Sequence, residues 1–372
     1  MRFLMLNWRD PSNPKAGGAE RVSLAYLAEL VRRGHEVSWF ANGFPGARKD
    51  EIVDGIRLIR GGGKGTSIVH AVRWYRRQPH FDLVIDQQHG LPWYAPWWCR
   101  TNCIAYIHEV LGPIWNSFYP WPISSIGRIQ ELWTLHRYRD IPYWTPSEST
   151  RKLLAAQGVQ QIKVIPNGCD TDPIPELEPK TLRSPLRLVV VSRLAPNKRV
   201  DHAIRLARVL RDRNVDLNLT IVGQGESEKP LRELVVALRL MDCIEFTGGL
   251  PEPEKNQQLR GAHFLIHTSV REGWGLNVLE ANAMATPAVV YPVAGLVDST
   301  LDGVTGSIAK QESPEGLADE LIALLRVPER YEQMRVNAWQ RSKEFSWSRI
   351  LPTAASWLEE QAAQSSPRAD TL

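Results

Sequence analysis

The residues best suited to chemistry gather in one segment of ten, Arg271–Glu280. The segment follows an apolar run and opens a helical pattern, with Glu272 before the predicted helix and Glu280 inside it. Gly273 and Gly275 permit backbone conformations and close approaches that a β-carbon would block. Amides at a helix start bind anionic oxygens, and carboxylates accept hydrogen bonds from sugar hydroxyls. The segment therefore indicates a site for a ligand with anionic oxygens and hydroxyl groups; the alternative is a tight turn with two solvated glutamates.

Two further segments carry candidate phosphate-binding groups. Arg193 and Lys198 stand where the first strand of the second half meets a helix, and two cations there suit a diphosphate. A cationic loop edge is the alternative. Gly17 and Gly18 lie between the first strand and the first helix, where they let the backbone approach a phosphate or a sugar. Their spacing is not that of a dinucleotide fingerprint, and an ordinary turn is the alternative.

The elements that position these groups alternate between strand and helix along the chain. The expected strands are 2–8, 36–41, 81–86, 103–108 and 164–166, then 186–191, 217–222, 244–247, 263–268 and 288–291. The expected helices are 19–33, 201–211, 226–240, 254–261, 277–284, 314–325, 329–344 and 348–361. Such alternation predicts parallel sheets with helices on both faces.

The predicted fold class is therefore α/β, with two doubly wound domains facing each other across a cleft. Residues 1–170 form the first domain, the proline-rich residues 171–185 a linker, and residues 186–345 the second domain. Residues 346–372 supply a C-terminal helix, expected to pack back on the first domain, and a polar tail, expected to be disordered. Ligands of doubly wound folds bind beyond the carboxyl ends of the strands, so the cleft is the expected site.

Composition limits the classes of partner. The 372 residues carry 45 basic and 41 acidic side chains, a surplus of +4 that is too small to favour nucleic acid. Residues 1–170 hold 21 basic and 14 acidic side chains, so the first half is the basic one. The four cysteines form no C-x-x-C pair, which indicates reduced thiols and a cytoplasmic protein. The longest uncharged stretches contain prolines and predict no spanning helix, and the N-terminal apolar run is too short for a signal peptide.

Taken together, these segments resemble the retaining family-4 glycosyltransferases of GT-B fold over about residues 1–350. No single motif is decisive, but their order and spacing are specific. The motifs that carry the resemblance are 17–22 (GGAERV), 33–37 (RGHEV), 164–168 (VIPNG), Ser192 and Arg193 with Lys198, 221–225 (IVGQG), 246–248 (FTG), Glu272 with Glu280, and 302–306 (DGVTG).

The resemblance implies a nucleotide-sugar donor held mainly by the second domain and an acceptor held mainly by the first. It assigns the donor diphosphate to Arg193 and Lys198, which would stabilise the leaving nucleotide. It assigns the ribose hydroxyls to Glu280, and the donor sugar and phosphate to Glu272 with the backbone of Gly273–Leu276.

For the remaining site residues, the resemblance implies that Gly17 and Gly18 approach the diphosphate. His108 matches a histidine beside the transferred sugar, although a lone histidine is more often structural. Trp274 replaces a common phenylalanine and is expected to alter the sugar preference. The family generally needs no catalytic metal, no metal-ligand cluster is evident in the sequence, and no cofactor is expected.

Tryptophan and arginine are interleaved in the first half of the chain. Seven of the 14 tryptophans fall between residues 93 and 144, among Arg100, Arg128, Arg137 and Arg139. This mixture suits sugar stacking and also a membrane interface. One hypothesis is therefore a glycolipid or lipid-linked acceptor, approached at the inner face of the plasma membrane through the basic first domain. The alternative is a core of buried aromatic side chains with solvated arginines.

These observations favour a retaining, metal-independent hexosyltransferase that moves a sugar from a nucleotide diphosphate to an acceptor hydroxyl of a cell-envelope glycan. We expect a UDP-sugar rather than a GDP-sugar as the donor. A sugar-nucleotide epimerase and a non-catalytic sugar-nucleotide-binding protein are the alternatives. The joint presence of Arg193, Lys198, Glu272 and Glu280 speaks against both.

Overall fold

The structure is a computed structural model that describes residues 1–63 and 65–364. The end of the predicted polar tail, residues 365–372, lies outside the described residues. The chain divides into two compact units, each built on its own sheet. The first unit comprises Met1–Gly112, Ser125–Gly168 and the chain from Trp347, and the second comprises Pro113–Ser124 and Cys169–Ser346.

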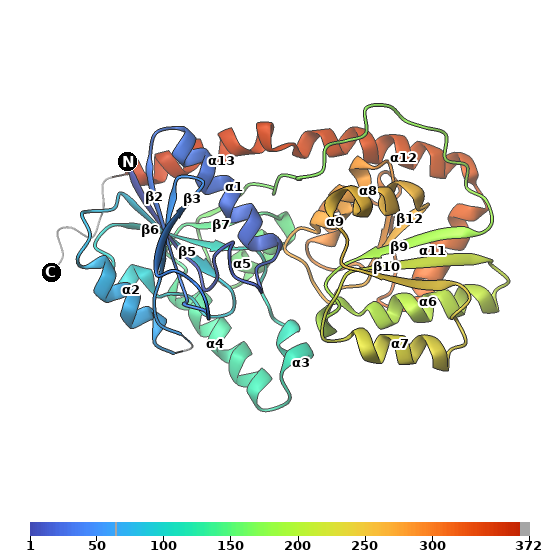
Figure 1. Ribbon diagram of the computed structural model, residues 1–372, viewed down its shortest axis with the longest axis horizontal. Coiled ribbons are helices and arrows are strands. Elements are labelled where there is room, and N and C mark those ends of the chain that lie inside the picture. Colours follow the sequence, from blue (N-terminus) through green and yellow to red (C-terminus); the bar gives the residue numbers. More distant parts are fainter. Residues whose placement is uncertain (64, 365–372) are drawn as a thin grey trace. The chain divides into compact units, whose positions relative to one another are not determined.

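The first unit contains an eight-stranded sheet in the order β3-β4-β2-β1-β5-β6-β7-β8 (Figure 1). Its strands are β1 (Arg2–Leu6), β2 (Glu36–Ala41), β3 (Asp50–Val53), β4 (Ile56–Arg60), β5 (Leu83–Gln88), β6 (Asn102–Ile107), β7 (Tyr143–Thr145) and β8 (Ile162–Val164). Neighbouring strands are parallel except for the hairpin of β3 and β4. Every residue of the central β5 is buried, as expected for a strand covered on both faces.

Helices of the first unit are α1 (Gly18–Arg32), α2 (Ser67–Tyr75), most of α4 (Ile123–Arg137), α5 (Glu148–Ala156) and α13 (Trp347–Ala363), with the short η1 (Ala95–Trp97). Helix α13, from the far end of the chain, lies beside α1. Arg33 and His35 both contact Glu359 of α13, at 2.9 and 2.8 Å, so polar contacts fasten this helix to the unit.

The second unit contains a parallel six-stranded sheet in the order β11-β10-β9-β12-β13-β14. Its strands are β9 (Leu186–Val191), β10 (Leu217–Val222), β11 (Ile244–Gly248), β12 (Phe264–His267), β13 (Ala288–Val290) and β14 (Gly306–Ile308). Its helices are α3 (Ile114–Phe118), η2 (Pro196–Lys198), α6 (Val200–Asp212), α7 (Glu228–Ala237), α8 (Glu252–Gly261), α9 (Leu276–Ala283), α10 (Leu296–Ser299), α11 (Pro314–Leu325), α12 (Pro328–Ser342) and η3 (Lys343–Phe345).

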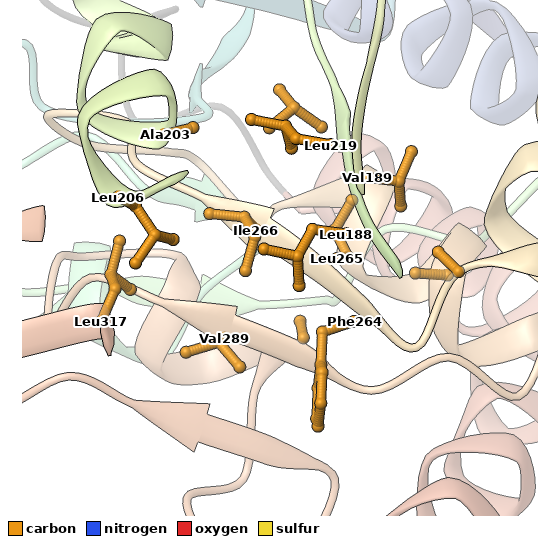
Figure 2. Packing of buried hydrophobic residues seen from close by; sticks show 14 of the residues in the cluster. Leu188, Val189, Ala203, Leu206, Leu219, Phe264, Leu265, Ile266, Val289 and Leu317 are labelled. Atoms are coloured by element: carbon orange, nitrogen blue, oxygen red, sulfur yellow. The ribbon is translucent and has the colours of Figure 1, made fainter. Parts of the chain in front are cut away.

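Helices cover both faces of this second sheet, α8 and α9 on one side and α6 and α7 on the other (Figure 1). Figure 2 shows the packing between sheet and helices: Ile266 of β12 lies on the side of Leu206 of α6 and Leu317 of α11, and Leu188 and Val189 of β9 belong to the same buried cluster. All five side chains are buried. The two sheets with their crossover helices confirm the predicted class of two doubly wound domains.

Two segments deviate from the predicted boundaries. Residues 113–124 fall in the predicted first domain but cluster with the second unit, because α3 packs beside η2. Residues 171–185 form no helix or strand and also belong to the second unit. The amide of Ile174 donates to the carbonyl of Ala283 at 2.9 Å, and Lys180 Nζ donates to Thr286 Oγ1 at 2.7 Å. The predicted linker is thus irregular chain fastened to the unit that follows it.

Candidate active site

The candidate site of the second unit lies at the carboxyl ends of β9 and β12. The turn after each strand is tied to the other by hydrogen bonds. Thr268 Oγ1 donates to the carbonyls of Lys198 and Arg199 at 3.0 and 2.9 Å, and Arg199 Nε donates back to the carbonyl of Thr268 at 2.8 Å. These contacts fix the backbone that carries Lys198 and Glu272, although the two residues are 74 positions apart.

Lys198 and Glu272 form a close ion pair, with Nζ 2.5 Å from Oε1. The same oxygen accepts a hydrogen bond from Ser269 Oγ at 2.6 Å and lies 3.6 Å from Nε2 of His267. Burial alone would raise the pKa of Glu272, but Lys198, His267 and these hydrogen bonds together lower it below its usual value. Burial lowers the pKa of His267 to about 4, so its imidazole is neutral at physiological pH. The pair is therefore an ammonium beside a carboxylate.

Arg193 supplies a second positive charge on the same loop. Its side chain is exposed and forms no hydrogen bond or ion pair with other described residues. The loop depends on Gly223, at the end of β10, whose φ is +139° and where a β-carbon would lie 1.8 Å from the carbonyl oxygen of Ser192. The glycines of the motif 221–225 thus permit a close approach to the backbone that presents Arg193.

The turn Gly273–Gly275 joins this pair to α9. Gly275 precedes the helix with φ +85°, the left-handed region that favours glycine. The amides of the first turn of a helix lack intrahelical acceptors, so the backbone that opens α9 at Leu276 offers donors to an anion. The Trp274 side chain is buried and packs edge-on against Phe345, with ring centroids 5.4 Å apart. The expected effect of Trp274 on sugar preference therefore finds no support, because the indole is buried against Phe345.

Glu280 lies on α9 and is also buried. Its Oε2 is 3.0 Å from Nζ of Lys255, a residue of α8 that the sequence reasoning missed. Lys255 also contacts Glu252, at 2.7 Å. The buried carboxylate is thereby neutralised and held in one orientation. No motif marked Lys255, and only the packing of α8 against α9 brings the two residues together.

The predicted residues of the first unit lie at the carboxyl ends of its central strands. Gly17 caps α1, and its amide donates to Glu20 Oε2 at 2.7 Å. A β-carbon at Gly17 would meet only this carboxylate oxygen, at 3.8 Å, so the protein itself does not require a glycine there. Gly18 is the first residue of the helix. His108 follows β6, is largely buried, and lies 3.0 Å from Nε2 of Gln87 on β5.

A separate cavity of about 520 Å³ opens on the second unit and contains none of the predicted site residues. Its lining includes Arg187, Asn218, Glu245 and Gln258. Across the described chain, His, Cys, Asp and Glu side chains do not gather in threes as they would around a metal ion. The helices of that same part of the chain are too short or too polar to cross a bilayer.

Two models of glycosyltransferase families match the chain, one in each half. The sequence model described as Glycosyltransferase Family 4 matches residues 16–173, and that described as Glycosyl transferases group 1 matches residues 176–341. A D-inositol 3-phosphate glycosyltransferase of Nocardia farcinica is 30% identical over 399 residues, covering 95% of this chain and 86% of the relative.

Solved structures agree on the fold. Sucrose-phosphate synthase from Thermosynechococcus elongatus superimposes with a TM-score of 0.80 at 17% identity, over 98% of this chain and 100% of the other. Anabaena Alr3699/HepE in complex with UDP-glucose gives a TM-score of 0.73 at 18% identity, over 97% and 100%. With both halves matched in order, and with one relative similar over nearly the whole length, this chain belongs to glycosyltransferase family 4, the retaining glycosyltransferases of GT-B fold.

Proposed function

We propose that this glycosyltransferase moves a hexosyl group from a UDP-sugar to a hydroxyl of a lipid-linked or other cell-envelope glycan. The observation that carries the proposal is the pair of Lys198 and Glu272 beside the exposed Arg193, at the strand ends of the second unit. Two cations next to a helix start suit a diphosphate, and ligands of doubly wound folds bind at this edge of the sheet.

Each predicted residue then has a role. Arg193 and Lys198 hold the diphosphate, and Glu280 accepts hydrogen bonds from the ribose hydroxyls. Glu272, with the backbone of Gly273–Leu276, contacts the donor sugar and its phosphate. In the first unit, Gly17 and Gly18 offer a backbone surface without β-carbons to the diphosphate, and His108 contacts the transferred sugar.

The cations supply most of the chemistry in this proposal. As the bond between the anomeric carbon and the phosphate oxygen breaks, negative charge grows on the diphosphate, where Arg193 and Lys198 stabilise it. The acceptor oxygen forms its bond to the anomeric carbon on the face that the phosphate leaves. The acceptor proton passes to the departing phosphate oxygen, so charge and atoms balance without a protein nucleophile.

The choice of UDP rests on likeness of fold to the Anabaena protein, whose complex contains UDP-glucose. Calorimetric titration with UDP-, GDP- and ADP-glucose tests it. We expect UDP-glucose to bind most tightly, and a clear preference for GDP- or ADP-glucose would overturn this part of the proposal.

The acceptor class is supported by an unusual helix in the first unit. On α4, Leu135 and the small or polar residues Ser124, Gly127, Glu131 and Thr134 are buried, while the other apolar residues are exposed: Ile123, Ile126, Ile129, Leu132 and Trp133. Ile126 and Ile129 are 63% and 67% exposed, and Trp133 is 52% exposed at helical spacing from them. An outward apolar stripe on a helix fits a lipid surface.

Charge favours an anionic lipid surface. The exposed charged residues of α4 are Arg128 and Arg137. Its acidic residue, Glu131, is buried and accepts hydrogen bonds from the amides of Leu111 and Gly112 at 2.6 and 2.9 Å. Arginines beside an apolar stripe suit the anionic inner leaflet, and the four cysteines are unpaired, as expected in a reducing compartment. We therefore place the enzyme at the cytoplasmic face of the membrane.

Vesicle flotation tests this surface directly. We expect binding to vesicles that contain phosphatidylglycerol. The affinity should drop about tenfold or more for Ile126→Gln with Ile129→Gln, because each isoleucine that becomes buried in the lipid contributes roughly 1.5–3 kcal/mol. Val236→Gln with Met241→Gln, which alters two exposed residues of the second unit, is the matched control. Failure of the wild type to bind at low salt would end the membrane assignment. If the protein is a dimer and the two isoleucine substitutions dissociate it, the apolar stripe of α4 binds a second copy of the chain rather than a membrane.

Transfer itself is tested by following UDP-glucose with and without glycan acceptors. We expect donor turnover that Lys198→Ala lowers about 100- to 1,000-fold, and a glycosylated product that retains the anomeric configuration. An epimerised nucleotide sugar formed without acceptor would support an epimerase instead. Binding of donor with no turnover under any condition would support a non-catalytic binding protein.

A further inference from the structure

A buried polar network surrounds the imidazole of His108 and goes beyond the roles assigned above. Its centre is Gln87, the fifth residue of β5, whose side chain is fully buried. Gln87 Oε1 lies 2.9 Å from Nδ2 of Asn7 and 2.9 Å from Oγ of Ser23. Its Nε2 lies 3.0 Å from Nε2 of His108 and 3.4 Å from Nε2 of His89.

The network orients the Gln87 amide. The Asn7 oxygen Oδ1 accepts from the amide of Arg9 at 3.4 Å, which turns the Asn7 nitrogen toward Gln87; that nitrogen can only donate, so the Gln87 atom that faces it is the carbonyl oxygen. The hydroxyl of Ser23 donates to the same oxygen, which uses both of its lone pairs. The amide nitrogen of Gln87 therefore points toward the two histidines, and an amide nitrogen can only donate.

This orientation fixes the position of the imidazole proton. Nε2 of His108 must accept from Gln87, so it carries no hydrogen. Burial lowers the pKa of His108 to about 3 and that of His89 to about 4, so both rings are neutral at physiological pH. A neutral ring without a proton on Nε2 carries it on Nδ1. Among the described residues, no side chain or carbonyl accepts from Nδ1 of His108, so this N–H is left for a ligand.

We propose that Gln87 is a positioning residue that holds His108 as the Nδ1–H tautomer, so that His108 donates a hydrogen bond to a substrate oxygen instead of removing a proton. The inference rests on the proposed contact of His108 with the transferred sugar. It agrees with a mechanism in which the departing phosphate takes the acceptor proton, because a histidine that acts as base would need a free lone pair facing the substrate.

Nitrogen-15 spectra of histidine-labelled protein test the tautomer without any substrate. We expect the His108 signals, assigned by their loss in His108→Gln, to show a protonated Nδ1 and an unprotonated Nε2. Gln87→Leu removes the donor and should release both His108 and His89 from this tautomer. Gln88→Leu is the matched control: Gln88 is the next residue of β5, is also buried, and contacts Tyr143 rather than a histidine.

Activity measurements separate positioning from folding. Gln87→Leu should lower kcat up to about tenfold, the value of one lost hydrogen bond, with the KM for donor nearly unchanged. Ser23→Ala, a smaller change, should shift the tautomer part of the way if Gln87→Leu fails to fold. A wild-type His108 with its proton on Nε2, or a tautomer unchanged by both variants, overturns the inference. Full activity in His108→Gln, with the expected tautomer in the wild type, would instead refute only the proposed sugar contact.

Discussion

The ion pair of Lys198 and Glu272 allows the structural and catalytic roles of Lys198 to be separated. Replacing Lys198 by methionine leaves a largely buried carboxylate without its cation. Removing one partner of a fully buried pair costs about 3–5 kcal/mol. Here the side chains of Lys198 and Glu272 are 21% and 15% exposed, and Ser269 still donates to the carboxylate. We therefore expect Lys198→Met to lower the free energy of unfolding by about 2–3 kcal/mol.

Adding Glu272→Gln to Lys198→Met removes the carboxylate charge that has lost its partner. We expect the double variant to lose only about 1 kcal/mol, so that Glu272→Gln made in the Lys198→Met background restores about 1–2 kcal/mol. Activity should behave differently, because the cation that we propose to stabilise the departing diphosphate is still missing. Lys198→Met and the double variant should both show kcat lowered about 100- to 1,000-fold.

The assays are urea unfolding and transferase turnover at saturating donor. The pair Arg208 and Asp212 on α6 is the control, since both side chains are exposed. Arg208→Met with Asp212→Asn should show a coupling of at most about 0.5 kcal/mol and an unchanged kcat. Recovery of wild-type kcat in the Lys198→Met, Glu272→Gln double variant would refute the reasoning, because Lys198 would then act only by neutralising Glu272.

Three further predictions concern the second unit. Glu280→Gln should raise the KM for donor about tenfold with little change in kcat, since the proposed ribose contact persists through the reaction. Lys255→Met, which removes the cation paired with the Glu280 carboxylate, should act in the same direction, and steady-state kinetics that show a fall in kcat instead would contradict both. Gly275→Ala should destabilise the protein by about 1–2 kcal/mol, because φ is +85° and a β-carbon would lie 2.9 Å from Ser299 Oγ; a melting temperature equal to that of the wild type would contradict this. His263 accepts a hydrogen bond on Nδ1 from the amide of Arg187, and its pKa is lowered to about 4 by burial first and then by Arg187. The pKa of His263 in the folded protein lies below its value of about 6.5 in the unfolded chain. The contribution of the neutral ring to the free energy of unfolding is therefore fully present above pH 6.5 and is lost as the pH falls toward 4. His263→Asn should remove about 1–2 kcal/mol of the pH dependence of unfolding, and titration curves of equal slope for both proteins would argue against it.

The sequence predicted the second unit well because its pattern is strong. Strands such as Leu186–Val191 are continuous apolar runs between helices of clear period, and five of the six strands were predicted, the short β14 being missed. The first unit was predicted less completely. The hairpin β3–β4 was missed although Asp54 and Gly55 form its turn, because its edge strand alternates weakly and Ile52 is exposed.

Helix α4 was missed for a different reason. The apolar residues of α4 lie on more than one side of the helix, since Ile126 and Ile129 are exposed and Leu135 is buried, so they repeat only weakly at helical spacing. A sequence can show that apolar residues recur along a helix, but it cannot show which side meets the core. The tryptophans between residues 93 and 144 are likewise divided, since Trp93 is fully buried and Trp121 is 80% exposed.

The candidate site could be predicted only where residues share a segment. Glu272 and Gly275 are neighbours in sequence, and Lys198 follows a predicted strand, so position along the chain brought each to the strand ends. Lys255 and Gln87 carry no motif. Each was found because it contacts a predicted residue from another element, Glu280 and His108 respectively. Orienting residues of this kind become visible only with the fold.

The most direct test is a crystal structure with UDP bound. We expect the diphosphate within hydrogen-bonding distance of Lys198 Nζ and the Arg193 guanidinium, and the ribose hydroxyls on Glu280. A diphosphate bound instead in the cavity beside Arg187 and Asn218, with Lys198 still turned to Glu272 and away from the ligand, would contradict the account.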